Sequence, residues 1–104
     1  MSTIYKLAAT IAARASTSPD SSYTAKLLHD GIDKCAKKFG EEAFELALAA
    51  SSKDKAHTAQ EAADVIYHLL VLLQASGISL ADVEVVLAAR EAQSGLDEKA
   101  KRSG

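Results

Sequence analysis

The sequence predicts an all-α protein, a bundle of four to five helices, on three observations. Alanine and leucine dominate an apolar fraction of 48%, and one proline and five glycines interrupt the 104 residues. Apolar residues recur at spacings of three and four, which is the period of an amphipathic helix. We find no segment that alternates apolar and polar residues as a half-buried strand does. A chain of this length favours a single domain.

The first predicted helix spans about residues 3–15, in which Ile4, Leu7 and Ile11 follow the helical spacing. Small polar residues around a proline then predict a loop over residues 16–22. The first helix should therefore end before this loop.

The second predicted helix spans about residues 23–50, with Ser22 as its N-cap. Gly31 marks an irregularity within it, because glycine weakens a helix interior by about 1 kcal/mol relative to alanine. After a polar break, the third predicted helix spans about residues 55–75 and ends with Gly77 at the position just beyond its C-cap.

The fourth predicted helix spans residues 80–92 and begins at a capping box made by Ser79 and Asp82. The polar residues 94–104 follow it, and we expect them to form a flexible C-terminal tail. The folded domain should accordingly comprise residues 1–93.

Charge and cysteine content narrow the class of protein. A formal net charge of −2, from 12 basic and 14 acidic residues, provides no bulk positive field for nucleic acid. One cysteine, Cys35, cannot form an internal disulfide, which fits a reducing cytosol. We find no signal peptide and no apolar run near the roughly 18 residues of a membrane span. We therefore expect a cytoplasmic protein whose partners include neither nucleic acid nor membrane.

Two pairs of carboxylates interrupt the apolar pattern. Glu42 and Glu45 are three residues apart in the second predicted helix, and Glu61 and Asp64 are three apart in the third. Each pair shares one helix face, and two antiparallel helices with a short connection would bring the pairs face to face. Carboxylates so close repel one another and raise their pKa values. Mg²⁺, which takes oxygen ligands and keeps some waters, would compensate the charge.

Basic residues lead into this acidic face. Lys34 and Lys38 fall within about 60° of Glu41 and Glu45 on the second predicted helix, at 100° per residue. Cationic side chains beside a carboxylate-bound metal suit a polyphosphate substrate. A second stripe on the third predicted helix carries His57, Glu61, Asp64 and His68.

Simpler interpretations of the same residues exist. Glutamates on a helix are most often a solvated face, and the lysines here would then serve solubility and pairing with glutamates one turn away. His68 would be a hydrogen-bonded boundary residue, and His57 would lie at the surface. Cys35 would be a small buried hydrophobe. The pattern alone leaves the metal site and these simpler roles both open.

Two motifs resemble a known superfamily. "GEEAFE" at residues 40–45, followed by "EAAD" at residues 61–64, matches the E-E-x-x-E…E-x-x-D motif of the MazG-like all-α nucleotide pyrophosphohydrolases. "SYTAKL", "KKFGEE" and "ADVIYHLLVLL" are more specific, and they resemble the phosphoribosyl-ATP pyrophosphohydrolases of histidine biosynthesis. The resemblance covers about residues 3–90.

The resemblance implies a homodimer that uses Mg²⁺ to hydrolyse phosphoribosyl-ATP to phosphoribosyl-AMP and pyrophosphate. It implies metal ligands at Glu42, Glu45, Glu61 and Asp64. Catalytic roles are implied for Glu41, Glu42 and Glu45. Glu41 could bind the metal, support the metal ligands or activate the attacking water, and the resemblance leaves these three roles open. The implied phosphate-binding residues are Lys34, Lys37 and Lys38, and His68 is a further candidate.

Other functions stay open at this stage. A house-cleaning pyrophosphohydrolase of the same superfamily would act on ordinary or damaged nucleoside triphosphates, and the motif allows it. A non-catalytic helical dimerisation module would carry its acids as solvated surface. A di-iron bundle fits less well, because it needs Glu-x-x-His pairs, whereas Asp64 and His68 are four apart.

The apolar run Val65–Leu73 predicts that the chain is a homodimer. Its helix would be apolar nearly all round, since Tyr67 lies on a different face from Ile66 and Leu70. The neighbouring helices of a small monomer would struggle to cover such a surface.

Overall fold

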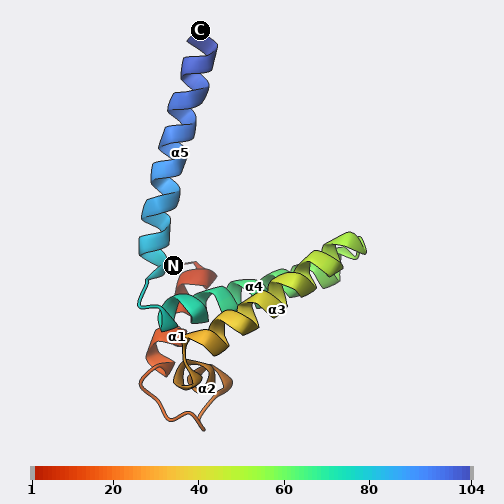
Figure 1. Cartoon of the computed structure of the whole chain (residues 1–104), viewed down its shortest axis with the longest axis vertical. Helices are drawn as coiled ribbons and strands as arrows, with labels where there is room; N and C mark the ends of the chain where they lie inside the picture. The colour runs from red at the N-terminus through yellow and green to blue at the C-terminus, as the bar shows by residue number, and fades with distance from the viewer. Residues whose placement is uncertain (1, 104) are drawn as a thin grey trace.

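Five α-helices make up the architecture (Figure 1). The computed structural model describes the backbone of residues 2–103 and the side chains of residues 2–95. The helices are α1 (Thr3–Arg14), α2 (Tyr23–Asp30), α3 (Ile32–Ser51), α4 (Lys55–Ala75) and α5 (Leu80–Ser103). No strand occurs over residues 2–103, and the predicted all-α class is confirmed.

Gly31 divides the second predicted helix into α2 and α3. Its φ of 101° and ψ of 175° lie in a region of backbone conformation that is essentially restricted to glycine. The helix predicted over residues 23–50 is thus two helices, divided at the irregularity expected at Gly31, and the helix count is the higher of the two expected. Ser22 caps α2 as predicted, because its side chain accepts a hydrogen bond from the Ala25 N–H at 3.0 Å.

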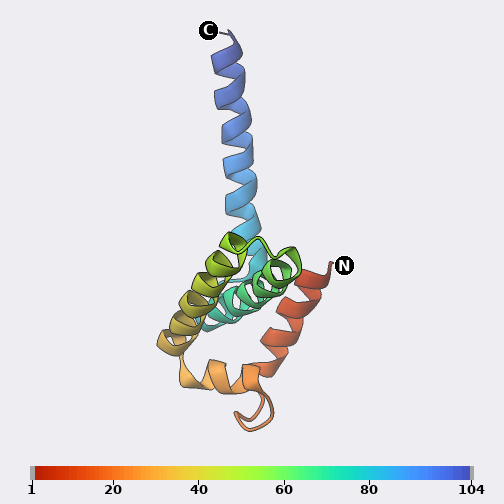
Figure 2. The same ribbon diagram turned by 90° about the vertical axis from the view of Figure 1, so that its right-hand side faces the viewer.

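The α3 and α4 helices run side by side as an antiparallel hairpin (Figures 1 and 2). A short turn joins them, with Lys53 at a positive φ of 64°. Asp54 caps α4, its carboxylate accepting a hydrogen bond from the His57 N–H at 3.0 Å. The α1 and α2 helices pack against the end of the hairpin that lies far from this turn (Figure 1).

The core lies where the first four helices meet. Its buried side chains are Ile11 of α1, Leu27 of α2, Cys35 of α3, and Leu70 and Val71 of α4. Cys35 is 1% exposed, and its thiol donates to the Leu27 carbonyl at 3.3 Å. The expectation of a small buried hydrophobe at this position is confirmed. This core ties α3 to α4 and so holds the hairpin faces in register.

The connection from α4 to α5 follows the predicted capping signals. Gly77 has a φ of 72°, and the Ile78 N–H closes the end of α4 by donating to the Leu73 carbonyl at 3.0 Å. Ser79 and Asp82 form the capping box. The Ser79 N–H donates to the Asp82 carboxylate at 2.9 Å, and the Asp82 N–H donates to the Ser79 hydroxyl at 3.1 Å.

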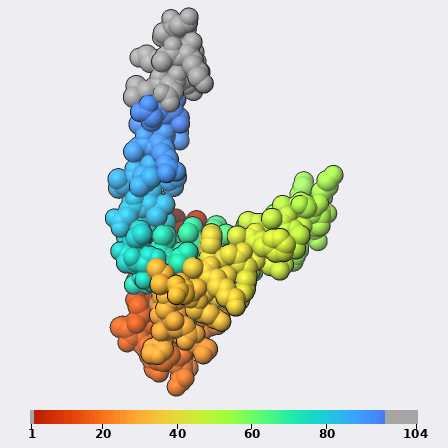
Figure 3. Space-filling model, viewed as in Figure 1, coloured from red at the N-terminus to blue at the C-terminus, as the bar shows by residue number. Residues whose placement is uncertain are grey.

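The α5 helix projects from the other helices (Figure 3). The Cα radius of gyration is 17.0 Å, against about 13 Å for a compact domain of 100 residues. Near its first turns the Tyr5 hydroxyl of α1 donates a hydrogen bond to the Glu84 carboxylate. Val85 of α5 is 70% exposed. The described part of the chain thus has two arms, α5 and the α3–α4 hairpin, above a common base.

The end of α5 differs from the prediction. The helix continues to Ser103 rather than ending at Ala92, because strong helix formers follow Gly95 and no proline stops the helix. The flexibility expected of residues 94–104 stays a prediction, and the side chains from residue 96 onward lie outside the described residues.

Among the described residues, no single helix has the length and apolar character needed to span a membrane. The α4 helix meets that criterion only in combination with Leu80–Gly95, and the two are bent by 108°.

Candidate active site

Three carboxylates from the two helices of the α3–α4 hairpin converge. Glu42 of α3 and Glu61 and Asp64 of α4 each offer one oxygen, and these oxygens all lie within 4.8 Å of one another. Asp64 is exposed, and the other two side chains are partly buried. The predicted face-to-face arrangement of acids on antiparallel helices is therefore present for three of the four.

Glu61 carries a buried carboxylate oxygen whose hydrogen-bonding capacity is unsatisfied. One carboxylate oxygen lies 3.8 Å from the His57 Nε2, while the other is buried and has no hydrogen-bond partner. A buried oxygen without a partner costs about 1–3 kcal/mol, and more when it is charged. A cation with oxygen ligands would satisfy it, so the residues present fit a divalent metal.

Glu45 and Glu41 flank the cluster without joining it. Glu45 lies one turn beyond Glu42 on α3 and is exposed, and its carboxylate is outside the three-residue group. Glu41 is also exposed, and it accepts a hydrogen bond from the Lys38 Nζ at 3.3 Å. Both acids lie on the same helix as Glu42, as predicted, but neither belongs to the cluster.

The three predicted phosphate-binding lysines differ in their surroundings. Lys38 is partly buried, and its pKa is raised chiefly by the hydrogen bond to Glu41 and also by the carboxylate charges of Glu41 and Glu42. It therefore stays protonated at neutral pH. Lys34 and Lys37 are exposed and form no ion pair with the side chains of residues 2–95. Lys38 is thus the lysine tied to the acidic face, in part through the pairing that the simpler interpretation expected.

His68 lies one turn beyond Asp64 on α4 and is 7% exposed. Its Nδ1 lies 2.9 Å from the Asp64 carbonyl oxygen; a carbonyl only accepts, so Nδ1 carries the proton. Its Nε2 is buried and has no hydrogen-bond partner. His68 is hydrogen-bonded as the simpler interpretation expected, but it is buried beneath the site rather than at the boundary.

Two tyrosines that sequence reasoning did not assign to the site lie beside His68. Tyr67 meets the imidazole edge-on with ring centroids 4.9 Å apart, and Tyr23 does so at 6.2 Å. A signal for both was present in the sequence. Tyr23 belongs to the "SYTAKL" motif, and Tyr67 follows Asp64 by three residues, which places it on a neighbouring part of the same helix.

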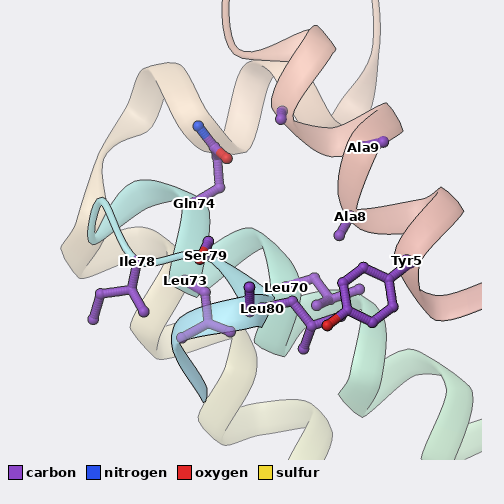
Figure 4. Close-up of a pocket in the computed structure, with 11 residues that line it drawn as sticks. Tyr5, Ala8, Ala9, Leu70, Leu73, Gln74, Ile78, Ser79 and Leu80 are labelled. Carbon is purple, nitrogen blue, oxygen red and sulfur yellow. The ribbon is translucent and has the colours of Figure 1, made fainter. Parts of the chain in front are cut away.

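A separate apolar pocket lies between α1, α4 and the start of α5 (Figure 4). It has a volume of about 300 Å³. In Figure 4 the side chains of Tyr5, Leu70 and Leu80 gather on one side of it, and Gln74 lies apart from them. None of the clustered acids lines this pocket, so it is distinct from the candidate active site.

Comparison with known proteins identifies the family. Residues 4–91 match the family described as phosphoribosyl-ATP pyrophosphohydrolase. The chain belongs to the phosphoribosyl-ATP pyrophosphohydrolase family. The span that matches the family contains all the acids, lysines and rings described above.

Curated relatives of this phosphoribosyl-ATP pyrophosphohydrolase family member are similar over nearly their whole length. A phosphoribosyl-ATP pyrophosphatase of Cereibacter sphaeroides is 56% identical over 102 residues, covering 98% of this chain and 99% of the relative. Phosphoribosyl-ATP pyrophosphatase 1 of Rhodopseudomonas palustris is 53% identical over 100 residues, covering 96% and 94%. Phosphoribosyl-ATP pyrophosphatase 1 of Bradyrhizobium diazoefficiens is 55% identical with the same coverage.

Proposed function

We propose that this protein hydrolyses phosphoribosyl-ATP to phosphoribosyl-AMP and pyrophosphate, the second step of histidine biosynthesis. The observation that carries the proposal is the convergence of Glu42, Glu61 and Asp64 within the segment that matches the family. The names of the relatives, each more than half identical to this chain, supply the substrate.

Mg²⁺ is the cation proposed for the cluster. Glu42, Glu61 and Asp64 would hold it, and Glu45, which is exposed one turn away, would join them by a change of side-chain rotamer. Bound there, the ion would neutralise phosphate charge and make a water more acidic. The unpartnered oxygen of Glu61 supports this choice, because hard divalent cations prefer carboxylate oxygens.

The side chains around the cluster would bind the phosphates and accept the proton of the attacking water. Lys38 keeps its positive charge beside the acids and would bind phosphate oxygens, with the exposed Lys34 and Lys37 extending that surface. Water attacks the α-phosphorus in line, and the bond from this phosphorus to the bridging oxygen breaks. A flanking carboxylate, Glu41 or Glu45, accepts the proton of the water. Pyrophosphate leaves with the bridging oxygen.

We also propose that the working form is a cytoplasmic homodimer. Large apolar side chains are exposed on both arms, with Phe44 at 63% and Leu48 at 52% on α3 and Val85 at 70% on α5. Water-exposed apolar surface of this kind on a small chain favours association. This dimer interface lies elsewhere than the apolar run from which the sequence predicted it, because Leu70 and Val71 of that run are already buried within the single chain.

Hydrolysis of phosphoribosyl-ATP beside a panel of nucleoside triphosphates tests the activity directly. We expect Mg²⁺-dependent release of pyrophosphate from phosphoribosyl-ATP, loss of activity on chelation, and much lower rates with the panel. Equal rates on the two kinds of substrate would favour the house-cleaning alternative. No hydrolysis of any nucleotide, with no thermal stabilisation by Mg²⁺, would favour a structural module.

Light scattering at micromolar concentration tests the oligomeric state. The expected mass is twice that of the 10.9 kDa chain. A Val85→Glu substitution should shift the protein toward monomer if α5 contributes to the interface, because a buried unpaired charge is costly. A wild-type protein that is monomeric under these conditions would contradict the homodimer.

A further inference from the structure

Three rings meet where α2 packs on α4. Tyr23, the first residue of α2, stacks on Tyr67 with ring centroids 6.5 Å apart and an interplanar angle of 22°. His68 meets both rings edge-on. The hydroxyls of Tyr67 and Thr24 share a hydrogen bond. Side chains of both helices therefore hold this ring cluster, made of Tyr23, Tyr67 and His68, in place.

Tyr23 is the exposed member of the ring cluster. It is 53% exposed, although contacts with two other rings fix its position. Tyrosine loses little conformational entropy on binding and offers a large flat surface. A tyrosine ring that is held by contacts with neighbouring rings and is also exposed to solvent offers a suitable surface for a planar ligand.

The ring cluster adjoins the acidic cluster. The His68 Nδ1 donates to the Asp64 carbonyl at 2.9 Å, and these two residues are separated by about 6 Å along the helix axis at 1.5 Å per residue. On the α3 side, the Lys38 Nζ donates a hydrogen bond to Glu41 at 3.3 Å, and Glu41 directly precedes Glu42 of the acidic cluster in the chain.

His68 contributes an unpartnered polar atom to the ring cluster. Its Nε2 has no hydrogen-bond partner among the described residues and is buried. Buried polar atoms in folded proteins nearly always have a partner, and an exception calls for a ligand or a bound water. The unpartnered oxygen of Glu61 and the unpartnered nitrogen of His68 both belong to α4, the first in the acidic cluster and the second in the ring cluster.

We propose that Tyr23, supported by Tyr67 and His68, is the surface on which the purine ring of the substrate stacks while its phosphates lie at the acidic cluster. The proposal rests on the proposed function and adds the base-binding residue to it. Bases stack on aromatic side chains through their π-faces.

Steady-state kinetics of two Tyr23 variants tests the proposal. Tyr23→Leu removes the ring and keeps an apolar side chain, whereas Tyr23→Phe keeps the ring. We expect Tyr23→Leu to raise KM for phosphoribosyl-ATP roughly ten- to a hundredfold, the range of one base–aromatic stack, with a smaller effect on kcat. Tyr23→Phe should restore most of the lost affinity. Tyr5→Leu is the matched control, because Tyr5 lines the separate apolar pocket.

Two binding measurements make the test independent of turnover. Saturation transfer from the protein to the adenine protons of AMP should be seen in the wild type and in Tyr23→Phe and lost in Tyr23→Leu. Photolabelling of the wild type with 8-azido-AMP should modify the tryptic peptide of residues 15–26, in which Tyr23 is the sole aromatic residue. The photolabelling needs no variant to fold.

The outcomes separate this proposal from the proposed function. Failure of the wild type to hydrolyse phosphoribosyl-ATP would overturn the function, while AMP contact would still test the base surface. A wild-type KM in Tyr23→Leu, or labelling of other peptides alone, would overturn the role of Tyr23. Loss of Mg²⁺-dependent thermal stabilisation in Tyr23→Leu together with the rise in KM would also overturn it, because the ring would then support the acidic cluster instead.

Discussion

Glu42 on α3 and Asp64 on α4 hold carboxylate oxygens within 4.8 Å of each other, although a helix end, a turn and a helix start separate them in the chain. Oxygens this close on two helices suit a divalent cation, because hard cations take carboxylate oxygens as ligands. Four predictions follow from this arrangement and from the helices that support it.

Asp64→Asn should separate catalysis from folding. Removing one electrostatic contributor should lower the rate on phosphoribosyl-ATP by about 10²-fold or more. The apo melting temperature should be unchanged or raised, because one repelling charge is gone, and the stabilisation by excess Mg²⁺ should be lost. Calorimetry with and without Mg²⁺ measures both effects. Glu91→Gln, an exposed acid on α5, is the control, and a similar loss of activity there would contradict a local role for Asp64.

Glu45→Gln should define the role of the acid that stands outside the three-residue cluster. We expect its activity to fall by about 10²-fold, as for the other acids. If Glu45 joins the metal ligands, the thermal shift caused by Mg²⁺ should shrink as well; if it only accepts the proton of water, the shift should persist. Wild-type turnover by this variant would exclude both roles.

Gly31→Ala and Gly40→Ala should change stability in opposite directions. Gly31 has a φ of 101°, so alanine there should destabilise the fold by about 1–3 kcal/mol. Gly40 lies inside α3, where alanine should stabilise the helix by about 0.5–1 kcal/mol. No atom lies within 4 Å of a Cβ added at either glycine, which leaves backbone conformation as the difference. Urea denaturation measures both, and equal changes would refute this account.

Cys35 should make stability fall at alkaline pH. Burial, and secondarily the charge of Asp30, raise the pKa of the folded thiol above its ordinary value of 9.0. As pH rises, the unfolded thiol therefore ionises before the folded one. The contribution of Cys35 to the free energy of unfolding is complete below the pKa of the unfolded thiol, and it is lost as pH rises through the pKa of the folded thiol. Urea denaturation of the wild type and Cys35→Ser between pH 8 and 10 measures the difference. A parallel decline in the two proteins would contradict the prediction.

Local signals in the sequence determined much of the secondary structure. Ser22, Gly77 and the pair Ser79–Asp82 cap helices where they were expected, because a cap depends on hydrogen bonds within a few residues of one helix end. The spacing of Glu61 and Asp64 likewise predicted a shared helix face, which the geometry of 3.6 residues per turn imposes on any helix. The motifs around these acids also identified the family.

Only the tertiary structure decided which side chains meet. Three acids converge while Glu45 stays outside, because the distance between side chains on two helices depends on how the helices pack and on each rotamer. The contact of Tyr23 with Tyr67 and His68 joins residues far apart in the chain, so no local pattern predicts it. Gly31 shows the same limit within one segment. A glycine at this position predicted a weak point in the helix. Packing of α2 and α3 on α4 selects the glycine-only backbone conformation that turns the chain there.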